Sequence, residues 1–227
     1  MEVDALLSLQ SSDSENAKHT ARSADTSYRG APLRRYFAEG IPLYLAATEW
    51  FQGKVAANTL KTRDFTRTLI ESNTPEGMVL TVPVVGGASA VKRLKPTQLE
   101  ISGHGDWTRI HLGAIEAAYG REPYFQHLFP EIATIISDYP QHLTHLNVLL
   151  MEKMMEFIGF SGQIGSIEAM RESHPERCAA IKQRLESKID PRHSLLEPLF
   201  RLGPDALFLL MESRLSSLRP EEISSPS

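Results

Sequence analysis

The fold is decided at residues 102–128, SGHGDWTRIHLGAIEAAYGREPYFQHL, where the spacing of apolar residues becomes helical. Asp106 suits the N-cap of a helix, because its carboxylate can accept hydrogen bonds from the free amides of the first turn. Gly120 suits the position just after the last turn. Residues spaced by four share one face of a helix, and we expect this face to be largely buried. The residues on it are Trp107, His111, Ile115 and Tyr119.

Upstream of this helix, residues 41–102 contain short apolar runs bounded by turn signals, which is typical of strands. The clearest run is MVLTVPV (78–84), which ends before Gly86 and Gly87. Four further runs are expected to add strands to the same sheet. They are IPLYLAA (41–47), VAAN (55–58), RTLIES (67–72) and QLEIS (98–102). These runs predict a small, mostly antiparallel sheet.

Downstream, the pattern remains helical to the end of the domain. Pro123 and Pro130 are expected to divide the next part into short helices, because proline interrupts helical hydrogen bonding. The segment QHLTHLNVLLMEKMMEFI (141–158) predicts a long amphipathic helix that ends at Gly159. Further helices are expected over residues 173–188, 194–202 and 204–215. Strands first and helices second predict an α+β fold, with an N-terminal, mostly antiparallel sheet followed by a helical C-terminal half.

The 227 residues are expected to form one domain over residues 31–216, between two disordered tails at 1–30 and 217–227. The tails are rich in small and polar residues and cannot bury enough apolar surface to offset the entropy of ordering. The formal net charge of −4 argues against a nucleic-acid partner. One cysteine, Cys178, agrees with a reducing compartment. The N-terminal segment MEVDALLSLQ has two acids and a short apolar run, which is unlike a signal peptide, and no run approaches about 20 apolar residues. These features predict a cytoplasmic protein that does not span a membrane.

His111 is the first candidate for chemistry. It is expected on the same helix face as Trp107 and Tyr119, where burial would lower its pKa and keep the imidazole neutral. A neutral imidazole suits a general base. The alternative is a core histidine whose ring nitrogens are bonded to the backbone.

Two further groups could bind an anion. His104 lies between two glycines just before the N-terminus of the predicted helix, where an anion is favoured. Lys61 and Arg67 lie at the entry to a predicted strand and could bind a phosphate or a carboxylate. A plain turn explains His104 better than an anion site does. A charged strand edge that discourages aggregation explains Lys61 and Arg67 equally well.

The sequence indicates no metal site and no cofactor. His142 and His145 are three residues apart, but no further ligand is suitably placed for zinc. The glycine-rich loops of nucleotide-binding proteins, and the serine elbow of hydrolases, are missing from the sequence. Cys178 resembles a packing residue more than a nucleophile.

Several segments together resemble one known family in the same order along residues 41–210. The segments are IPLYLAATEWF (41–51), KTRDFTRTLI (61–70), MVLTVPV (78–84), WTRIHLGAIEAAYGREPYFQHL (107–128) and SLLEPLFRLGPDALFLL (194–210). The matching positions include Tyr44, Leu45, Glu49, Phe51, Lys61, Arg67, Ile70, Trp107, His111, Ala118, Tyr119, Pro123, Tyr124 and Phe125. They are similar to the WbqC-like family, small bacterial proteins often associated with gene clusters for O-antigen and other cell-surface polysaccharides. The chain departs from the family pattern at Thr66, where an asparagine is expected, and at Ala46, where a proline is expected.

The resemblance implies kinship more than a reaction, and our first hypothesis is a transferase that assembles or modifies a surface polysaccharide and acts on an activated or amino-substituted sugar. In this interpretation the ligand is a small molecule, a sugar or a nucleotide sugar. The catalytic residues would be His111, as the base, and Glu49, which would bind a hydroxyl or an amine. The substrate-binding residues would be Lys61, Arg67, Trp107, Tyr119, Tyr124 and His104. A non-catalytic binding or scaffold protein of the same pathway is the alternative, and a regulatory protein with an acidic tail is a third interpretation.

Overall fold

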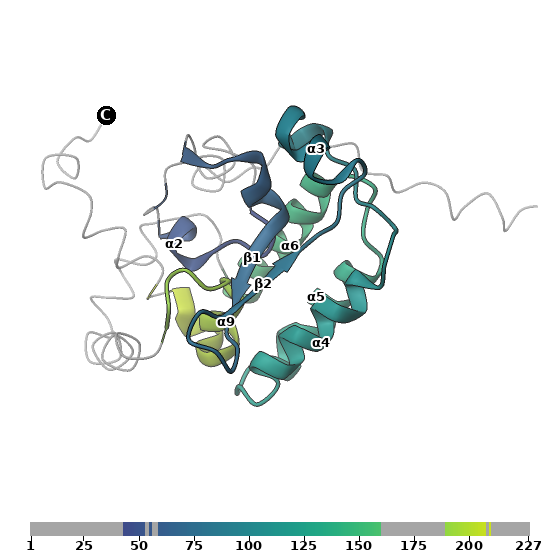
Figure 1. The fold of residues 1–227 in the computed structure, drawn as a ribbon. Helices are drawn as coiled ribbons and strands as arrows, with labels where there is room; N and C mark the ends of the chain where they lie inside the picture. Colours follow the sequence, from purple (N-terminus) through teal and green to yellow (C-terminus); the bar gives the residue numbers. More distant parts are fainter. Residues whose placement is uncertain (1–42, 53–54, 56–58, 160–188, 208, 210–227) are drawn as a thin grey trace, which may run out of the picture.

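The computed structural model describes residues 43–52, 55, 59–159, 189–207 and 209. Within these residues the chain has the predicted α+β fold, with a small antiparallel sheet followed by helices (Figure 1). Strand β1 (Arg67–Ile70) pairs with β2 (Met78–Thr81) in a register that places Arg67 opposite Thr81. The runs at 67–72 and 78–84 therefore contain the two strands of one hairpin, which makes up the sheet of the described residues.

The hairpin turn requires a glycine at its end. Gly77 has a φ of +74°, and a Cβ at this position would lie 2.7 Å from the carbonyl oxygen of Ile70. An L side chain would meet both backbone strain and a steric clash here. The turn is thus fixed close to β1.

The other predicted strands are reduced to single bridges. Ala47 pairs with Ser194, Val84 with Ile101, and Glu100 with His142. The prediction of a strand at 41–47 is wrong over its described part, because the chain turns at Tyr44 and Leu45. Leu45 has a φ of +42° and is fully buried. The rest of that run lies outside the described residues, as does all of VAAN except Val55.

Short helical segments connect these pieces. They are α2 (Thr48–Phe51), η2 (Thr62–Thr66), α3 (Gly87–Arg93) and η3 (Pro96–Gln98). The first two lie just before β1 and become important for the pocket described below.

Helix α4 (Trp107–Tyr119) confirms the predicted helix and its buried face. The four residues of that face are buried, and they are Trp107, His111, Ile115 and Tyr119. Asp106 occupies the N-cap position, but its carboxylate bonds to Arg109 and does not cap the helix. The apolar spacing, more than the cap, defines this helix.

Helix α5 (Phe125–Ser137) corrects the prediction of short helices divided at Pro130. Pro130 lies inside this single helix. It removes one backbone donor, but Pro130 and Gln126, four residues before it, are both exposed. Water can therefore satisfy the carbonyl that loses its helical partner, and the helix continues.

The long helix predicted at 141–158 is confirmed as α6 (Leu143–Phe157). The next described helices are α9 (Leu196–Leu202), within the helix predicted at 194–202, and η4 (Gly203–Asp205), which begins one residue before the helix predicted at 204–215. The helix predicted at 173–188, which contains Cys178, and most of the one at 204–215 lie outside the described residues. The predicted tails also lie outside them.

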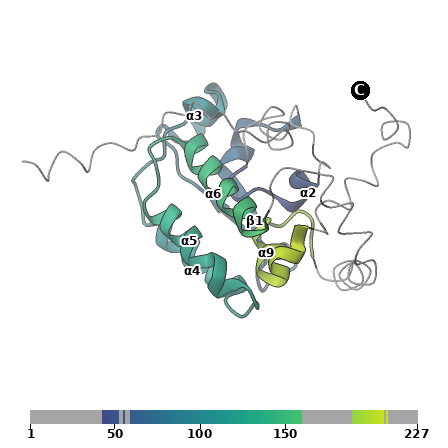
Figure 2. The same cartoon turned by 180° about the vertical axis from the view of Figure 1, so that it is seen from behind.

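Helix α6 lies behind the hairpin when the two views are compared (Figures 1 and 2). Helix α5 packs against α4, α6 and α9, and the buried face of α4 is turned toward the hairpin. Fully buried side chains from these elements form one core, including Leu99, Ile115, Leu128, Ile132, Ile136, Leu143 and Phe200. In the described part of the chain, we find no helix with the length and apolar character needed to cross a membrane.

Candidate functional site

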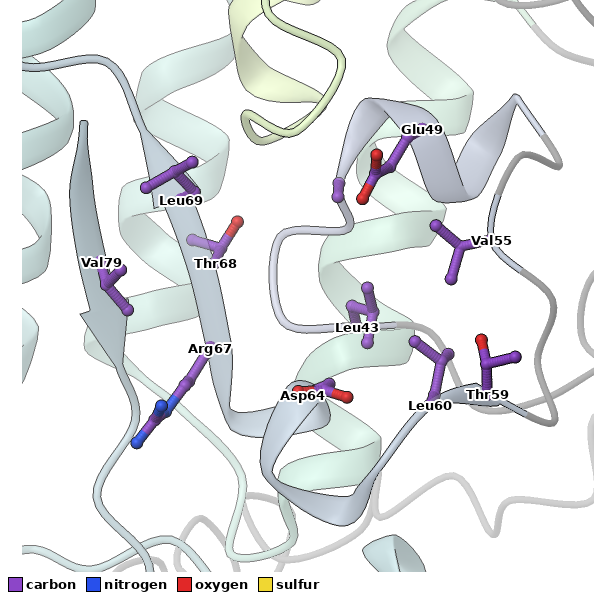
Figure 3. Close-up of a pocket in the computed structure, with 11 residues that line it drawn as sticks. Leu43, Glu49, Val55, Thr59, Leu60, Asp64, Arg67, Thr68, Leu69 and Val79 are labelled. Carbon is purple, nitrogen blue, oxygen red and sulfur yellow. The ribbon is translucent and has the colours of Figure 1, made fainter. Parts of the chain in front are cut away.

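A pocket of about 420 Å³ lies between β1, α2 and η2 (Figure 3). Its polar lining comes from Glu49, Asp64, Arg67, Thr68 and Thr59. Its apolar lining comes from Leu43, Ala47, Val55, Leu60, Leu69 and Val79. The structure therefore brings two of the predicted residues, Glu49 and Arg67, to one cavity although they lie on different elements.

Glu49 is positioned by the segment that precedes α9. Its backbone amide donates to the carbonyl of Pro191 at 2.7 Å, and the amide of Thr48 donates to His193 at 2.9 Å. These bonds satisfy first-turn amides of α2 that would otherwise lack partners. The Glu49 carboxylate points into the hollow between α2 and β1 (Figure 3).

Asp64 and Arg67 lie at the other end of the pocket. Asp64 accepts a hydrogen bond from the amide of Lys61 at 2.8 Å and lies 3.5 Å from Arg63. Arg67 is exposed, and its side chain points away from Glu49 (Figure 3). Among the described residues, no carboxylate forms an ion pair with Arg67. Arg67 thus contributes to the lining of the pocket while its guanidinium group extends away from Glu49.

His111 does not line the pocket. It is 3% exposed, its Nδ1 lies 2.9 Å from the Tyr44 hydroxyl, and its ring makes a backbone hydrogen bond with Thr81. Burial lowers the pKa of His111 to about 4, although the bond to Thr81 opposes this effect. A general base must exchange a proton with a ligand, and this ring is enclosed by protein. The structure favours the alternative, a core histidine.

The remaining predicted residues also lie outside the pocket. Trp107 packs its ring against His111 at 5.1 Å, and the Tyr119 hydroxyl accepts a hydrogen bond from the Glu71 amide. Burial raises the pKa of Tyr119, as expected for a phenol in the core. These side chains stabilise α4 against the hairpin.

Three others lie at the surface or near it. His104 is exposed in its loop, with its amide bonded to Ser102, and Lys61 is exposed at the start of η2. Tyr124 is half-buried, and its ring lies where a Cβ on Gly203 would be. None of the three lines the pocket.

Sequence reasoning missed a second group of charged residues, centred on Arg201. Its guanidinium group bonds to Glu197 at 2.5 Å, to Glu71 at 2.5 Å and to Glu122 at 3.1 Å. The second oxygen of Glu197 lies 2.7 Å from His193 Nδ1. We call these five residues the Arg201 cluster. The signal in the sequence is a spacing of four from Glu197 to Arg201, which places both on one face of the helix predicted at 194–202, with His193 four residues before Glu197.

Glu197 is the most deeply buried carboxylate of the Arg201 cluster, at 1% exposure. Burial raises the pKa of Glu197, while the charge of Arg201 and the hydrogen bond from His193 lower it. Its two oxygens are both bonded, which is what a buried carboxylate requires. The Arg201 cluster thus fixes α9 to Glu71, just after β1, and to Glu122, just after α4.

The fold and the pocket define a small α+β domain with a cavity of mixed apolar and polar lining beside a two-stranded sheet. Residues 58–189 match the WbqC-like protein family, and this chain belongs to that family. The matched region includes Asp64, Arg67 and the hairpin, whereas Glu49 and the Arg201 side chain lie beyond it. No curated protein and no solved structure matches the chain.

Proposed function

We propose that this protein is a transferase that acts on an activated or amino sugar during the biosynthesis or modification of a bacterial cell-surface polysaccharide of O-antigen type. The observation that carries the proposal is the pocket with Glu49 and Arg67 in its lining. Its volume of about 420 Å³ lies within the range of small-molecule sites. Membership of the WbqC-like family supports the pathway.

The lining of the pocket suits a sugar. The Glu49 carboxylate can accept hydrogen bonds from hydroxyl groups or pair with an amino group. The side chains of Leu43, Val55 and Leu60 offer apolar contact to the C–H face of the ring. The exposed guanidinium group of Arg67 can bind a phosphate in bidentate fashion. A nucleotide sugar would then lie with its sugar toward Glu49 and its phosphate at Arg67.

A non-catalytic binding protein of the same pathway is the second candidate. The burial of His111 favours it, because the residue first expected to act as the base is enclosed in the core. Both candidates require the same pocket, and they differ in whether a proton acceptor adjoins it. For either function we propose a cytoplasmic location, with Cys178 as the only thiol in support.

Isothermal titration calorimetry on the full chain tests the pocket. The probes are UDP-N-acetylglucosamine and free glucosamine. We expect Arg67→Met to weaken binding of the nucleotide sugar by about tenfold or more, because a charge-assisted hydrogen bond to phosphate is lost. The same variant should leave glucosamine binding nearly unchanged. Glu49→Gln should weaken binding of both probes.

Lys61→Met is the matched control. It removes the same charge from an exposed residue that does not line the pocket, so it should leave both affinities close to the wild-type values. Equal losses in Lys61→Met and Arg67→Met would contradict the proposed site, since they would reflect net charge alone. Absence of binding by either probe would also contradict it.

A further inference from the structure

We infer that a group of basic residues around the end of α3 is a docking surface for the negatively charged face of a lipid bilayer. The group consists of Lys61, Arg63, Lys92, Arg93 and Lys95, together with the apolar Leu94, and we call it the α3 patch. The inference goes beyond the proposed function, because it concerns a different surface and a different kind of partner. The attachment is peripheral and uses side chains at the surface of the domain.

The α3 patch is built from two segments that are distant in the sequence. The hydroxyl of Thr62 donates a hydrogen bond to the carbonyl of Leu94 at 3.3 Å, across 32 positions. This bond joins η2 to the end of α3, and the two elements pack against each other. The residues on either side of Thr62 and of Leu94 are all basic, so the bond brings four cations close together. They are Lys61, Arg63, Arg93 and Lys95.

The basic side chains of the α3 patch are exposed, and they are barely compensated by acids. Asp64 is the one acidic residue within 61–66 and 87–95, and it lies 3.5 Å from Arg63. The three lysines of the patch form no ion pair among the described residues. Like charges held together repel one another, and an anionic partner makes such an arrangement favourable.

The position of α3 separates these cations from the acids of the chain, whose formal net charge is −4. In both views α3 lies toward one end of the molecule and α9 toward the other (Figures 1 and 2). Electrostatic interactions are screened over about 8 Å at physiological ionic strength. A flat anionic surface in contact with α3 is therefore attracted by the patch and is little affected by the acids of the Arg201 cluster.

The apolar residues at α3 favour a lipid surface over a nucleic acid. Leu94 is 36% exposed between two cations, and Val85, just before α3, is 55% exposed. Apolar side chains among Lys and Arg can enter the boundary between headgroups and acyl chains, while the cations bind the headgroup phosphates. Single-stranded nucleic acids are bound instead by aromatic side chains that stack on the bases, and residues 84–99 contain no aromatic residue.

The α3 patch adjoins the pocket through residues 61–66. Asp64 lines the pocket, whereas Lys61 and Arg63, from the same segment, belong to the patch. A protein bound to a bilayer through the α3 patch would hold the pocket near the lipid surface.

Co-sedimentation of the full chain with lipid vesicles tests the inference. The vesicles contain phosphatidylcholine alone, or equal parts of phosphatidylcholine and phosphatidylglycerol. We expect binding to the mixed vesicles, weakened by added salt, and little binding to phosphatidylcholine alone. Each Lys or Arg at an anionic surface strengthens binding about fivefold. The double variant Lys92→Gln/Lys95→Gln should therefore lower the partition coefficient about 25-fold.

The double variant Arg121→Gln/Arg192→Gln is the matched control. It removes the same charge from two exposed residues outside the α3 patch, one just after α4 and one before α9. Its partition coefficient should stay close to the wild-type value. Leu94→Gln should weaken binding at constant charge, because the apolar contact with the lipid is lost. Circular dichroism checks that each variant is folded.

Equal losses in the two double variants would overturn the inference, since they would reflect net charge alone. Equal binding to the two kinds of vesicle, or no binding to either, would also overturn it. Binding to polyuridine without binding to vesicles would assign the α3 patch to nucleic acid and overturn it as well. If a variant does not fold, the comparison of the two vesicles with the wild-type chain still decides. None of these results bears on sugar binding at the pocket, which the calorimetry tests separately.

Discussion

At the residue scale, His111 shows how burial turns a reactive side chain into a core residue. Its ring lies between the Tyr44 hydroxyl and the backbone of Thr81, and both Tyr44 and His111 are buried. A charged imidazole would lose its hydration here without gaining a carboxylate partner. The neutral form is therefore part of the folded state.

This neutral histidine predicts a pH dependence of stability. The unfolded chain binds a proton at His111 near pH 6.5, while the folded chain does so only near pH 4. In this window the unfolded state binds more protons, so the free energy of unfolding falls as the pH falls. The contribution at the acid end is about 3 kcal/mol. His111→Gln should show a flatter profile in urea denaturation between pH 6.5 and 4, and an unchanged slope would refute the assignment.

Tyr44→Phe tests the hydrogen bond to the same ring. The change removes the hydroxyl 2.9 Å from Nδ1 and leaves a buried polar atom without a partner. We expect the free energy of unfolding to fall by about 1–2 kcal/mol, measured by urea denaturation at pH 7. Tyr139→Phe is the matched control, because Tyr139 packs on Trp107 and its hydroxyl has no hydrogen bond within the described residues. Equal losses in the two variants would mean that the bond to His111 contributes nothing.

At the scale of elements, the end of α9 depends on a glycine. Gly203 has a φ of +58° and a ψ of −134°, and a Cβ there would lie 2.5 Å from the ring of Tyr124. The amide of Tyr124 also donates to the carbonyl of Phe200 at 2.9 Å. The end of α9 and the start of α5 are thus in direct backbone contact. No side chain fits between them.

Gly203→Ala should therefore destabilise the protein by about 2–4 kcal/mol, through backbone strain and overpacking against Tyr124. Gly105→Ala separates the two effects, since Gly105 has a φ of +75° but no atom within 4 Å of a Cβ. It should lose only the strain, about 1 kcal/mol. Thermal unfolding by circular dichroism measures both. If Gly203→Ala loses no more stability than Gly105→Ala, the Tyr124 ring can move aside and the proposed overpacking is wrong.

At the scale of the whole molecule, the Arg201 cluster joins three distant parts of the chain. Arg201 lies on α9, Glu71 follows β1, and Glu122 lies between α4 and α5. The positive charge of Arg201 compensates the negative charges of the three carboxylates around it. Without it, Glu197 would be a buried carboxylate that keeps, among the described residues, only its bond to His193.

Arg201→Met should lower the free energy of unfolding by about 3 kcal/mol or more, because breaking a buried pair leaves its partner uncompensated. The loss should shrink as the pH falls, since burial already raises the pKa of Glu197 and the carboxylate then takes up a proton. Arg192→Met is the control, because Arg192 pairs with Asp190 at an exposed position. It should change stability little. Similar losses in the two variants would refute a special role for the Arg201 cluster.

The sequence predicted secondary structure correctly where the apolar periodicity within a single element determines that element. The spacing of four from Trp107 to Tyr119 identified α4 and its buried face, and MVLTVPV identified β2. It failed at residues 41–47, where an apolar run forms a buried turn, and at Pro130, where exposure lets a helix continue. Intrinsic propensity reflects only the local sequence, whereas burial at residues 41–47 and solvent exposure at Pro130 decided which secondary structure formed.

The sequence by itself determined the α+β order, the helix face that enters the core and the family to which the chain belongs. Only the tertiary structure decided that His111 is enclosed, that Glu49 and Arg67 line one pocket, and that Arg201 bonds to three carboxylates. The physical reason is that burial and charge pairing depend on groups far apart in the chain. His111 meets Tyr44 across 67 positions, and Arg201 meets Glu71 across 130.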